Sequence, residues 1–171
     1  LGLNKTPSIT PQLTARIEDT AEGDIVEINP QTRAIAAQIG NHIETYKGVA
    51  ILIDYGDWRS LGDTVQAVKN HQFVDILSAP GEVDLTAHVD FEAIVNAAYC
   101  AASRLTPQGV LLERLGITPR AQTLAKNLSG PALEQHIAAH RRLTHPDEMG
   151  TVFKALALFP KASPPPPGFQ T

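Results

Sequence analysis

Residues 83–91 alternate between apolar and polar side chains without interruption. The apolar positions are Val83, Leu85, Ala87 and Val89, and the polar positions are Asp84, Thr86, His88 and Asp90. Successive side chains of a β-strand point to opposite faces, so the pattern predicts a strand with one apolar face. Its other face is lined by residues that can carry protons or bind metals, which makes it the first candidate for a functional surface.

A second pattern, with a period near four, predicts a helix from Pro30 to about Tyr46. Isoleucines recur along one side of it, at Ile35, Ile39 and Ile43. Asn29 is a favoured N-cap, and the proline after it occupies the first helical position, where its missing N–H costs nothing. The apolar residues within 25–28 predict a strand before this helix.

The continuous apolar run at 49–53 predicts a strand buried on both faces of a parallel sheet. Together with 25–28 and the helix it would form a βαβ-like unit, with a right-handed crossover if the two strands are parallel. Ligands of open α/β sheets bind beyond the carboxyl ends of the strands. We therefore expect Asp54, Tyr55 and Gly56 at a functional edge.

The rest of the chain divides into shorter predicted elements. A strand is predicted at 65–68, and a long connection after it leaves the loop around His71 free to lie over a site. A helix capped by Asp90 is predicted over 91–104. Three further helical pieces cover 106–116, 118–129 and 130–145, and a strand covers 151–159. The final prolines predict a polyproline or disordered tail over 161–171.

Composition narrows the class of protein. The 171 residues suffice for one domain with a core, and no apolar run is long enough for a transmembrane helix. A net charge of −4 with 5% aromatic residues argues against a nucleic-acid partner. Cys100 is the only cysteine, so it forms no internal disulfide, and we expect it to pack in the core.

The candidate residues also have structural explanations. Asp90 directly precedes a predicted helix, so an N-cap role worth about 1 kcal/mol is its favoured explanation. For Trp58, packing as a loop anchor is favoured over a role as a lid. Asp84 and Thr86 follow a predicted turn, where such side chains often hydrogen-bond to the backbone. This structural role and a role in a functional site are equally favoured for them. Metal binding is not expected, because His88 and Asp90 have only His71 as a further nearby ligand.

Two further groups differ in how strongly they point to function. Asp54 is harder to explain structurally, because an unpaired carboxylate at the end of a buried strand is costly. The basic residues of 130–145, His136, His140 and Arg141, indicate a solvated face, with a docking surface as the lesser alternative. No glycine-rich nucleotide-binding turn follows any predicted strand. Residue patterns alone therefore predict an α/β segment with an acidic, histidine-containing edge, and no particular reaction.

Three blocks in order resemble the MidA-like family of S-adenosylmethionine-dependent methyltransferases. They are GVAILIDYG at 48–56, GDTVQAVKNHQFVDILSAPGEVDLTAHVDF at 62–91 and LLERLGITPRAQTL at 111–124. The flanking GDIVEINPQTRAIAAQI and EMGTVFKALALFP are similar to the family as well, so the resemblance covers 23–160.

The resemblance implies a class I methyltransferase fold, which is an α/β, Rossmann-like sheet with an added helical region, here at about 91–148. Its glycine-rich cofactor loop is expected upstream of Leu1, so the residues that bind S-adenosylmethionine are unknown from this chain. Residues 1–22 would be an irregular connection and 23–160 the C-terminal part of the methyltransferase domain. This segment alone is not expected to bind the cofactor well or to be active.

The family includes an arginine methyltransferase that assists assembly of respiratory complex I, so a complex I subunit is the implied protein substrate. Carboxylates that accept the N–H fork of a guanidinium would orient the nitrogen for methyl transfer. The expected catalytic residues are Asp54, Tyr55, His71, Asp84 and His88, and the expected substrate-binding residues are Thr86, Asp90 and Trp58. Asp84 and His88 are expected nearest the substrate.

Two other functions stay open. A non-catalytic assembly chaperone would keep the fold and use the helices of 120–143 to dock a client protein. A methyltransferase acting on a small molecule would need a deeper cleft. A bacterial cytoplasm is the preferred location, with the mitochondrial matrix expected for a eukaryotic protein.

Overall fold

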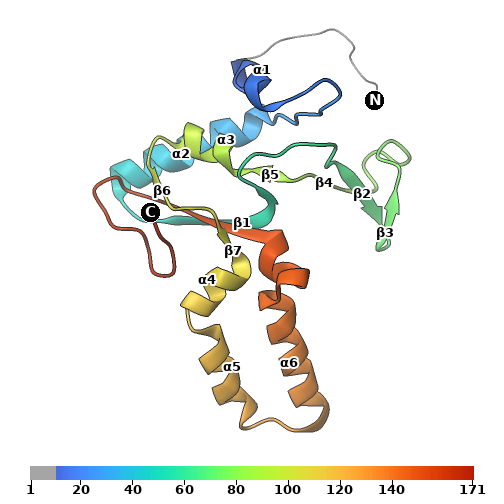
Figure 1. Ribbon diagram of the computed structural model, residues 1–171, viewed down its shortest axis with the longest axis vertical. Coiled ribbons are helices and arrows are strands. Elements are labelled where there is room, and N and C mark those ends of the chain that lie inside the picture. The colour runs from blue at the N-terminus through green and yellow to red at the C-terminus, as the bar shows by residue number, and fades with distance from the viewer. Residues whose placement is uncertain (1–10) are drawn as a thin grey trace.

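The computed structural model describes residues 11–171, with side chains from Leu13 onward (Figure 1). The helices are α1 Pro11–Thr14, α2 Pro30–Tyr46, α3 Phe91–Ala98, α4 Gln108–Arg114, α5 Ile117–Ala125 and α6 Gly130–Thr144, with single turns at Ile17–Asp19 and Pro146–Gly150. The strands are β1 Ala50–Asp57, β2 Gln66–Lys69, β3 Gln72–Val74, β4 Asp84–Thr86, β5 Val89–Asp90, β6 Ala101–Ala102, β7 Thr106–Pro107 and β8 Phe153–Phe159. The α/β class predicted from the sequence is confirmed.

The larger sheet is mixed rather than parallel. Its strand order is β5-β1-β8-β6, and β7 also pairs with β8. Residues 50–55 of β1 pair antiparallel with β8, while only Gly56 and Asp57 pair in parallel with β5. The predicted parallel neighbour at 25–28 is not a strand. This prediction is wrong because 25–28 bonds to the loop at 62–65 instead, beginning with the Gly62 amide and the Ile25 carbonyl.

Helix α2 begins and ends where the sequence predicts. The Asn29 side chain accepts hydrogen bonds from the amides of Gln31 and Thr32, which confirms the N-cap. Helix α2 packs so closely on α3 that a Cβ atom on Gly40 would overlap the carbonyl oxygen of Ala98. Only part of the predicted isoleucine face is covered: Ile43 is buried, whereas Ile35 is exposed.

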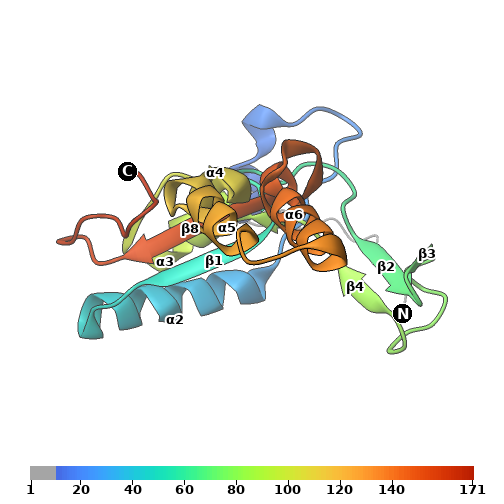
Figure 2. The same ribbon diagram turned by 90° about the horizontal axis from the view of Figure 1, so that it is seen from below.

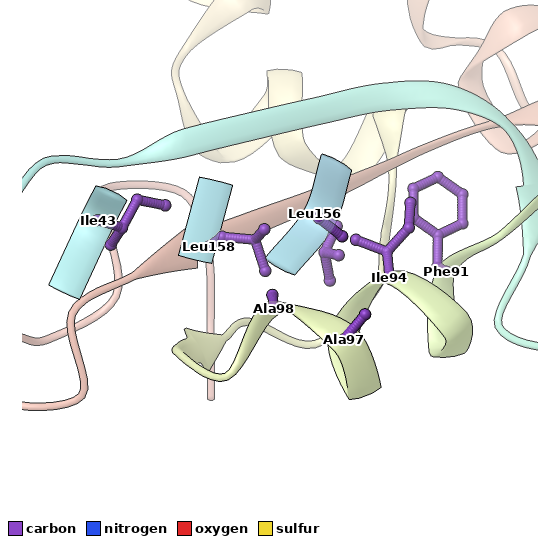
Figure 3. Close-up of a cluster of buried hydrophobic side chains, with 8 residues drawn as sticks. Ile43, Phe91, Ile94, Ala97, Ala98, Leu156 and Leu158 are labelled. Atoms are coloured by element: carbon purple, nitrogen blue, oxygen red, sulfur yellow. The ribbon is translucent and has the colours of Figure 1, made fainter. Parts of the chain in front are cut away.

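Helices α2 and α3 cover one face of the β1–β8 pair and form the main core. Figure 3 shows its side chains between the two helices and β8. The buried members are Ala36, Ile43, Phe91, Ile94, Ala97, Ala98, Leu156 and Leu158. Helix α3 ends at Ala98, earlier than predicted, because Tyr99 adopts a left-handed conformation with a φ of 57°. Cys100 follows and packs against this core, and burial raises the pKa of its thiol.

The opposite face of the sheet is covered over β8 but not over β1. Leu111 of α4 and Phe169 of the tail pack there against alternate residues of β8. Arg114 donates hydrogen bonds to the Gly168 carbonyl and the Gln170 side chain, so the prediction of a disordered tail is wrong for this end of it. Ile51 and Ile53 are 53% and 50% exposed, so the prediction that β1 is buried on both faces is also wrong.

The alternating segment 83–91 is not one strand. Its first part is β4, which pairs with β2 in a separate three-stranded sheet, and its last part is β5, which pairs with β1. Figure 2 shows the small sheet projecting away from the large one. Asn70 and His71, both with positive φ, form a two-residue turn between β2 and β3, so the predicted long loop around His71 is wrong.

Helices α5 and α6 form an arm that projects from the large sheet (Figure 1). The two helices are linked by histidines: His136 Nε2 lies 2.9 Å from the Ala121 carbonyl oxygen, and His140 Nε2 lies 2.9 Å from Thr118 Oγ1. Both rings are therefore partly buried, so the prediction of a solvated basic face is wrong for the two histidines, whereas Arg141 is exposed as predicted. Among residues 11–171, no helix combines the length and apolar character needed to cross a membrane.

Candidate functional site

An open cleft of about 1150 Å³ lies along the edge of β1 that β8 does not occupy. Its walls are the approach to α2, the middle of β1 and the segment that joins β4 to α3. Four of the predicted site residues line it: Asp54, Thr86, His88 and Asp90. The cleft is therefore where Thr86, His88 and Asp90 come together with Asp54 of β1.

The other predicted site residues lie outside the lining of the cleft. His71 is exposed at the β2–β3 turn, and Asp84 is exposed on β4. Trp58 anchors a loop, because its indole N–H donates to Glu92 Oε1 at 3.1 Å. Tyr55 is not part of the lining but touches a residue that is. Asp54 and Tyr55 lie within β1, which continues to Asp57, rather than beyond its end.

Tyr55 connects β1 to His88. The two ring centroids are 5.9 Å apart with the planes at 70°, and the Tyr55 ring also contacts Phe153, with centroids 5.6 Å apart. The contact depends on the close approach of β1 and β5, where Gly56 pairs with Val89. A Cβ atom on Gly56 would overlap the Val89 carbonyl oxygen, and the φ of 154° at this position also favours glycine.

Asp90 is committed to structural bonds. Its Oδ1 accepts the Ala93 amide at 2.8 Å, which confirms the predicted N-cap of α3. Its Oδ2 lies 3.6 Å from Nη1 of Arg16, a buried residue that also donates to the Ser60 carbonyl at 3.1 Å. An arginine buried in this way fixes the carboxylate beside it, so Asp90 has little capacity left for a substrate.

The neighbouring charges form a closed cluster with Arg16. Arg59 donates to both oxygens of Glu92, at 2.6 and 2.9 Å, and also to Asp19 at 3.3 Å. The hydrogen bond from Arg16 lowers the pKa of the Asp19 carboxyl, and the charges of Arg16 and Arg59 act in the same direction. These bonds hold the loop after β1 against the start of α3 and use both oxygens of Glu92.

Glu27 also lines the cleft, although the sequence patterns did not predict it as a site residue. Its Oε1 accepts the amides of Thr64 and Val65 at 2.8 and 3.1 Å, and its Oε2 accepts the Thr64 hydroxyl. The Thr64 hydroxyl oxygen in turn accepts the His88 amide at 2.9 Å. A glutamate set between Val26 and Ile28 was the available signal, because a charge inside an apolar run needs partners.

Asp54 is the cleft carboxylate with spare capacity. Its Oδ1 accepts only the amide of Tyr55, at 2.8 Å, and no bond within the described chain reaches Oδ2. Lys154 is its cross-strand neighbour but donates to the Thr151 carbonyl at 2.7 Å instead. Of the four acidic residues that line the cleft, Glu27, Asp90 and Glu92 are engaged at both oxygens. Asp54 alone offers an open oxygen to a ligand.

The cleft does not resemble a metal site or a nucleotide site. No group of three or more metal-ligating side chains occurs in the part of the chain that the structure describes. The described lining contains no glycine, so it has no loop through which a backbone could closely approach a nucleotide. The described lining of the cleft therefore lacks the glycine-rich turn that is typical of a nucleotide site.

Comparison with known proteins identifies what the chain is similar to. Residues 1–111 match the family model described as "Putative S-adenosyl-L-methionine-dependent methyltransferase". The chain is 33% identical over 172 aligned residues to the mitochondrial protein arginine methyltransferase NDUFAF7 of Xenopus tropicalis, covering 96% of this chain and 40% of that protein. The human protein of the same name is 32% identical over 157 residues, covering 90% of this chain and 35% of its own length.

A solved structure agrees with these sequence matches. A protein from Burkholderia thailandensis, in a crystal structure with bound S-adenosyl-homocysteine, superposes with a TM-score of 0.61 at 26% identity. The match covers 78% of this chain and 35% of that one. The chain therefore spans about two fifths or less of the length of the relatives named here.

Proposed function

The chain belongs to the family of S-adenosyl-L-methionine-dependent methyltransferases that its residues 1–111 match, and from this premise we propose that the complete protein methylates an arginine of a protein substrate. This chain would supply one wall of the substrate cleft. The observation that carries the proposal is the open carboxylate oxygen of Asp54 in the cleft beside β1. The names of the relatives, which are protein arginine methyltransferases, support the choice of arginine.

Asp54 suits a guanidinium for a physical reason. The arginine guanidinium stays protonated and presents N–H donors in a fixed plane, but it has no acceptor atoms. A carboxylate oxygen without another partner can accept hydrogen bonds from these donors. A bond to Asp54 would orient the reacting nitrogen and hold part of the positive charge. Asp54 would thus select a cationic side chain over a neutral one.

His88 and Tyr55 would contribute on the other side of the β1 edge. Methylation joins a methyl carbon to nitrogen, so the nitrogen must give up a proton. The ring nitrogens of His88 have no partner within the described residues, and His88 is an exposed residue of the cleft lining, so its ring can receive that proton. Tyr55 would hold the ring in place through the edge contact. Thr86, also in the lining, would bind the substrate through its hydroxyl.

The cofactor would be held mainly by the part of the family that this chain does not span. S-adenosylmethionine would supply the methyl group when it is bound: the bond between the methyl carbon and the sulfonium sulfur would break as the bond to the arginine nitrogen forms, with the electron pair left on sulfur. We propose a subunit of respiratory complex I as the protein substrate, because the family resemblance points to it. The proposed location is the cytoplasm for a bacterial protein and the mitochondrial matrix for a eukaryotic one, the latter supported by the names of the relatives.

Labelled-methyl transfer tests this function. The complete protein is incubated with methyl-tritiated S-adenosylmethionine and an extract of cells that lack it, and protein hydrolysates are then examined for methylarginine. Label in methylarginine supports the proposal. Label in small molecules alone would favour the small-molecule alternative, and no transfer, with the protein folded, would favour the assembly chaperone. The projecting α5–α6 arm is the feature that favours the chaperone reading.

A further inference from the structure

We propose that Glu27 and Thr64 are positioning residues that set the place of His88 in the cleft. This inference rests on the proposed function, because it assigns a role to residues behind a proposed catalytic group. The two residues and the His88 amide form a chain of hydrogen bonds that crosses three separate segments. We call this chain the His88 latch.

His88 needs such support because neither sheet holds it. Strand β4 ends at Thr86 and β5 begins at Val89, so the backbone at residues 87–88 belongs to no ladder. At this break between the strands, the His88 amide donates to Thr64 Oγ1 at 2.9 Å. Loss of this bond would remove one constraint on the backbone that carries the imidazole.

The latch has a defined direction. The Thr64 hydroxyl has one hydrogen, which goes to Glu27 Oε2, so its oxygen lone pairs face the His88 N–H. Glu27 also accepts the amides of Thr64 and Val65, which fixes the backbone on which the hydroxyl stands. Three donors on one carboxylate make a charge-assisted cluster that an amide side chain cannot reproduce, because its NH₂ group is a donor.

The latch also explains why a charged residue lies within the apolar stretch before α2. Glu27 lines the cleft, but its two oxygens are turned to the loop at 64–65. It is therefore unavailable to a substrate, and its effect on methyl transfer would pass through Thr64 to His88. The latch thus bonds the His88 backbone amide, while the Tyr55 ring contacts the His88 imidazole.

A double-mutant cycle on the complete protein tests the inference. Thr64→Val removes the hydroxyl at nearly constant shape, and Thr64→Ser keeps it. We expect Thr64→Val to lower kcat for methyl transfer about tenfold, Thr64→Ser to recover most of that loss, and Glu27→Gln to resemble Thr64→Val. In a His88→Ala background, Thr64→Val should change kcat less than about twofold. Equal losses in both backgrounds would overturn the inference.

Hydrogen exchange gives a readout that does not depend on activity. The His88 amide should exchange at least about tenfold faster in Thr64→Val than in wild type, while amides of the β1–β8 ladder keep their rates. If the wild-type protein transfers no methyl group, the proposed function fails, and this exchange rate alone decides whether the latch exists. If Thr64→Val does not fold, Thr64→Ala and Glu27→Gln take its place. An unchanged His88 exchange rate would refute the latch.

Discussion

The ring of Tyr55 lies edge-on against the imidazole of His88, with centroids 5.9 Å apart, and so joins the central strand β1 to the break between β4 and β5. The Tyr55 ring also packs on Phe153 of β8, with the ring centroids 5.6 Å apart. One aromatic side chain thus ties the proposed catalytic histidine to the most buried strand of the fold.

If this packing positions His88, the rate of methyl transfer should depend on an aromatic ring at residue 55 more than on the Tyr55 hydroxyl. Tyr55→Phe should keep methyl transfer within about twofold of wild type, whereas Tyr55→Leu should lower kcat about fivefold, since an aromatic pair contributes about 1 kcal/mol. Steady-state kinetics of the complete protein would measure both. A Tyr55→Phe protein as slow as Tyr55→Leu would mean that the hydroxyl itself takes part.

The close approach of β1 and β5 predicts a specific cost at Gly56. Gly56→Ala should destabilise the protein by about 3 kcal/mol, because the new methyl group overlaps the Val89 backbone at a strained φ. Gly62 is the matched control: its φ is also positive, but a Cβ atom there meets nothing within 4 Å. Gly62→Ala should therefore cost only about 1 kcal/mol in urea unfolding. Equal costs would contradict the close approach.

The packed tail predicts a difference between two phenylalanines. Phe169 is 7% exposed against Leu111 and β8, while Phe73 on the small sheet is 76% exposed. Phe169→Ala should lower the free energy of unfolding by about 3 kcal/mol, and Phe73→Ala by less than about 0.5 kcal/mol. The urea midpoints of the two variants give the comparison. Indistinguishable midpoints would show that the tail does not pack as described.

Asp19 predicts a pH dependence of stability. Arg16 lowers the pKa of this carboxyl in the folded protein, so its contribution is present above the ordinary aspartate pKa of about 3.9 and is lost as the pH falls through the lowered value. Asp19→Asn should therefore be less stable than wild type at pH 7, and the gap should close as the pH falls below about 4. Urea titrations across this range measure the gap.

Asp63 provides the comparison for that experiment, because none of the ion pairs found in the described chain includes it. For Asp63→Asn, the difference in unfolding free energy from wild type should not shrink in this way as the pH falls. A gap for Asp19→Asn that stays constant with pH would mean that its carboxylate contributes nothing through charge.

The sequence predicted the elements that local chemistry determines. Asn29 and Asp90 cap helices where they were expected to, and the strand at 151–159 is β8. The predictions were wrong where the structure depends on pairing between strands that are distant in the sequence. The alternation across 83–91 is the same whether the segment pairs with one strand or with two. The strand is interrupted at His88 because residues 84–86 pair with β2, whereas residues 89–90 pair with β1.

The site shows the same division. Asp54, Thr86, His88 and Asp90 were chosen by residue type and strand pattern, and all four line the cleft. The sequence could not predict which of their polar atoms lack a hydrogen-bond partner, because the partners are distant in the chain. Arg16 is 74 residues from Asp90, and Thr64 is 37 residues from Glu27. His71 and Asp84 share the same residue types but lie on the small sheet, outside the lining.

The proposed role of the cleft is tested most directly by methyl transfer from the complete protein carrying Asp54→Asn or Asp84→Asn. Both changes remove one carboxylate with little change of shape, but only Asp54 has its open oxygen in the cleft. We predict that Asp54→Asn lowers kcat/KM about a hundredfold and that Asp84→Asn stays within about twofold of wild type, with both variants folded. Equal activity of the two variants, or a larger loss for Asp84→Asn, would contradict the account.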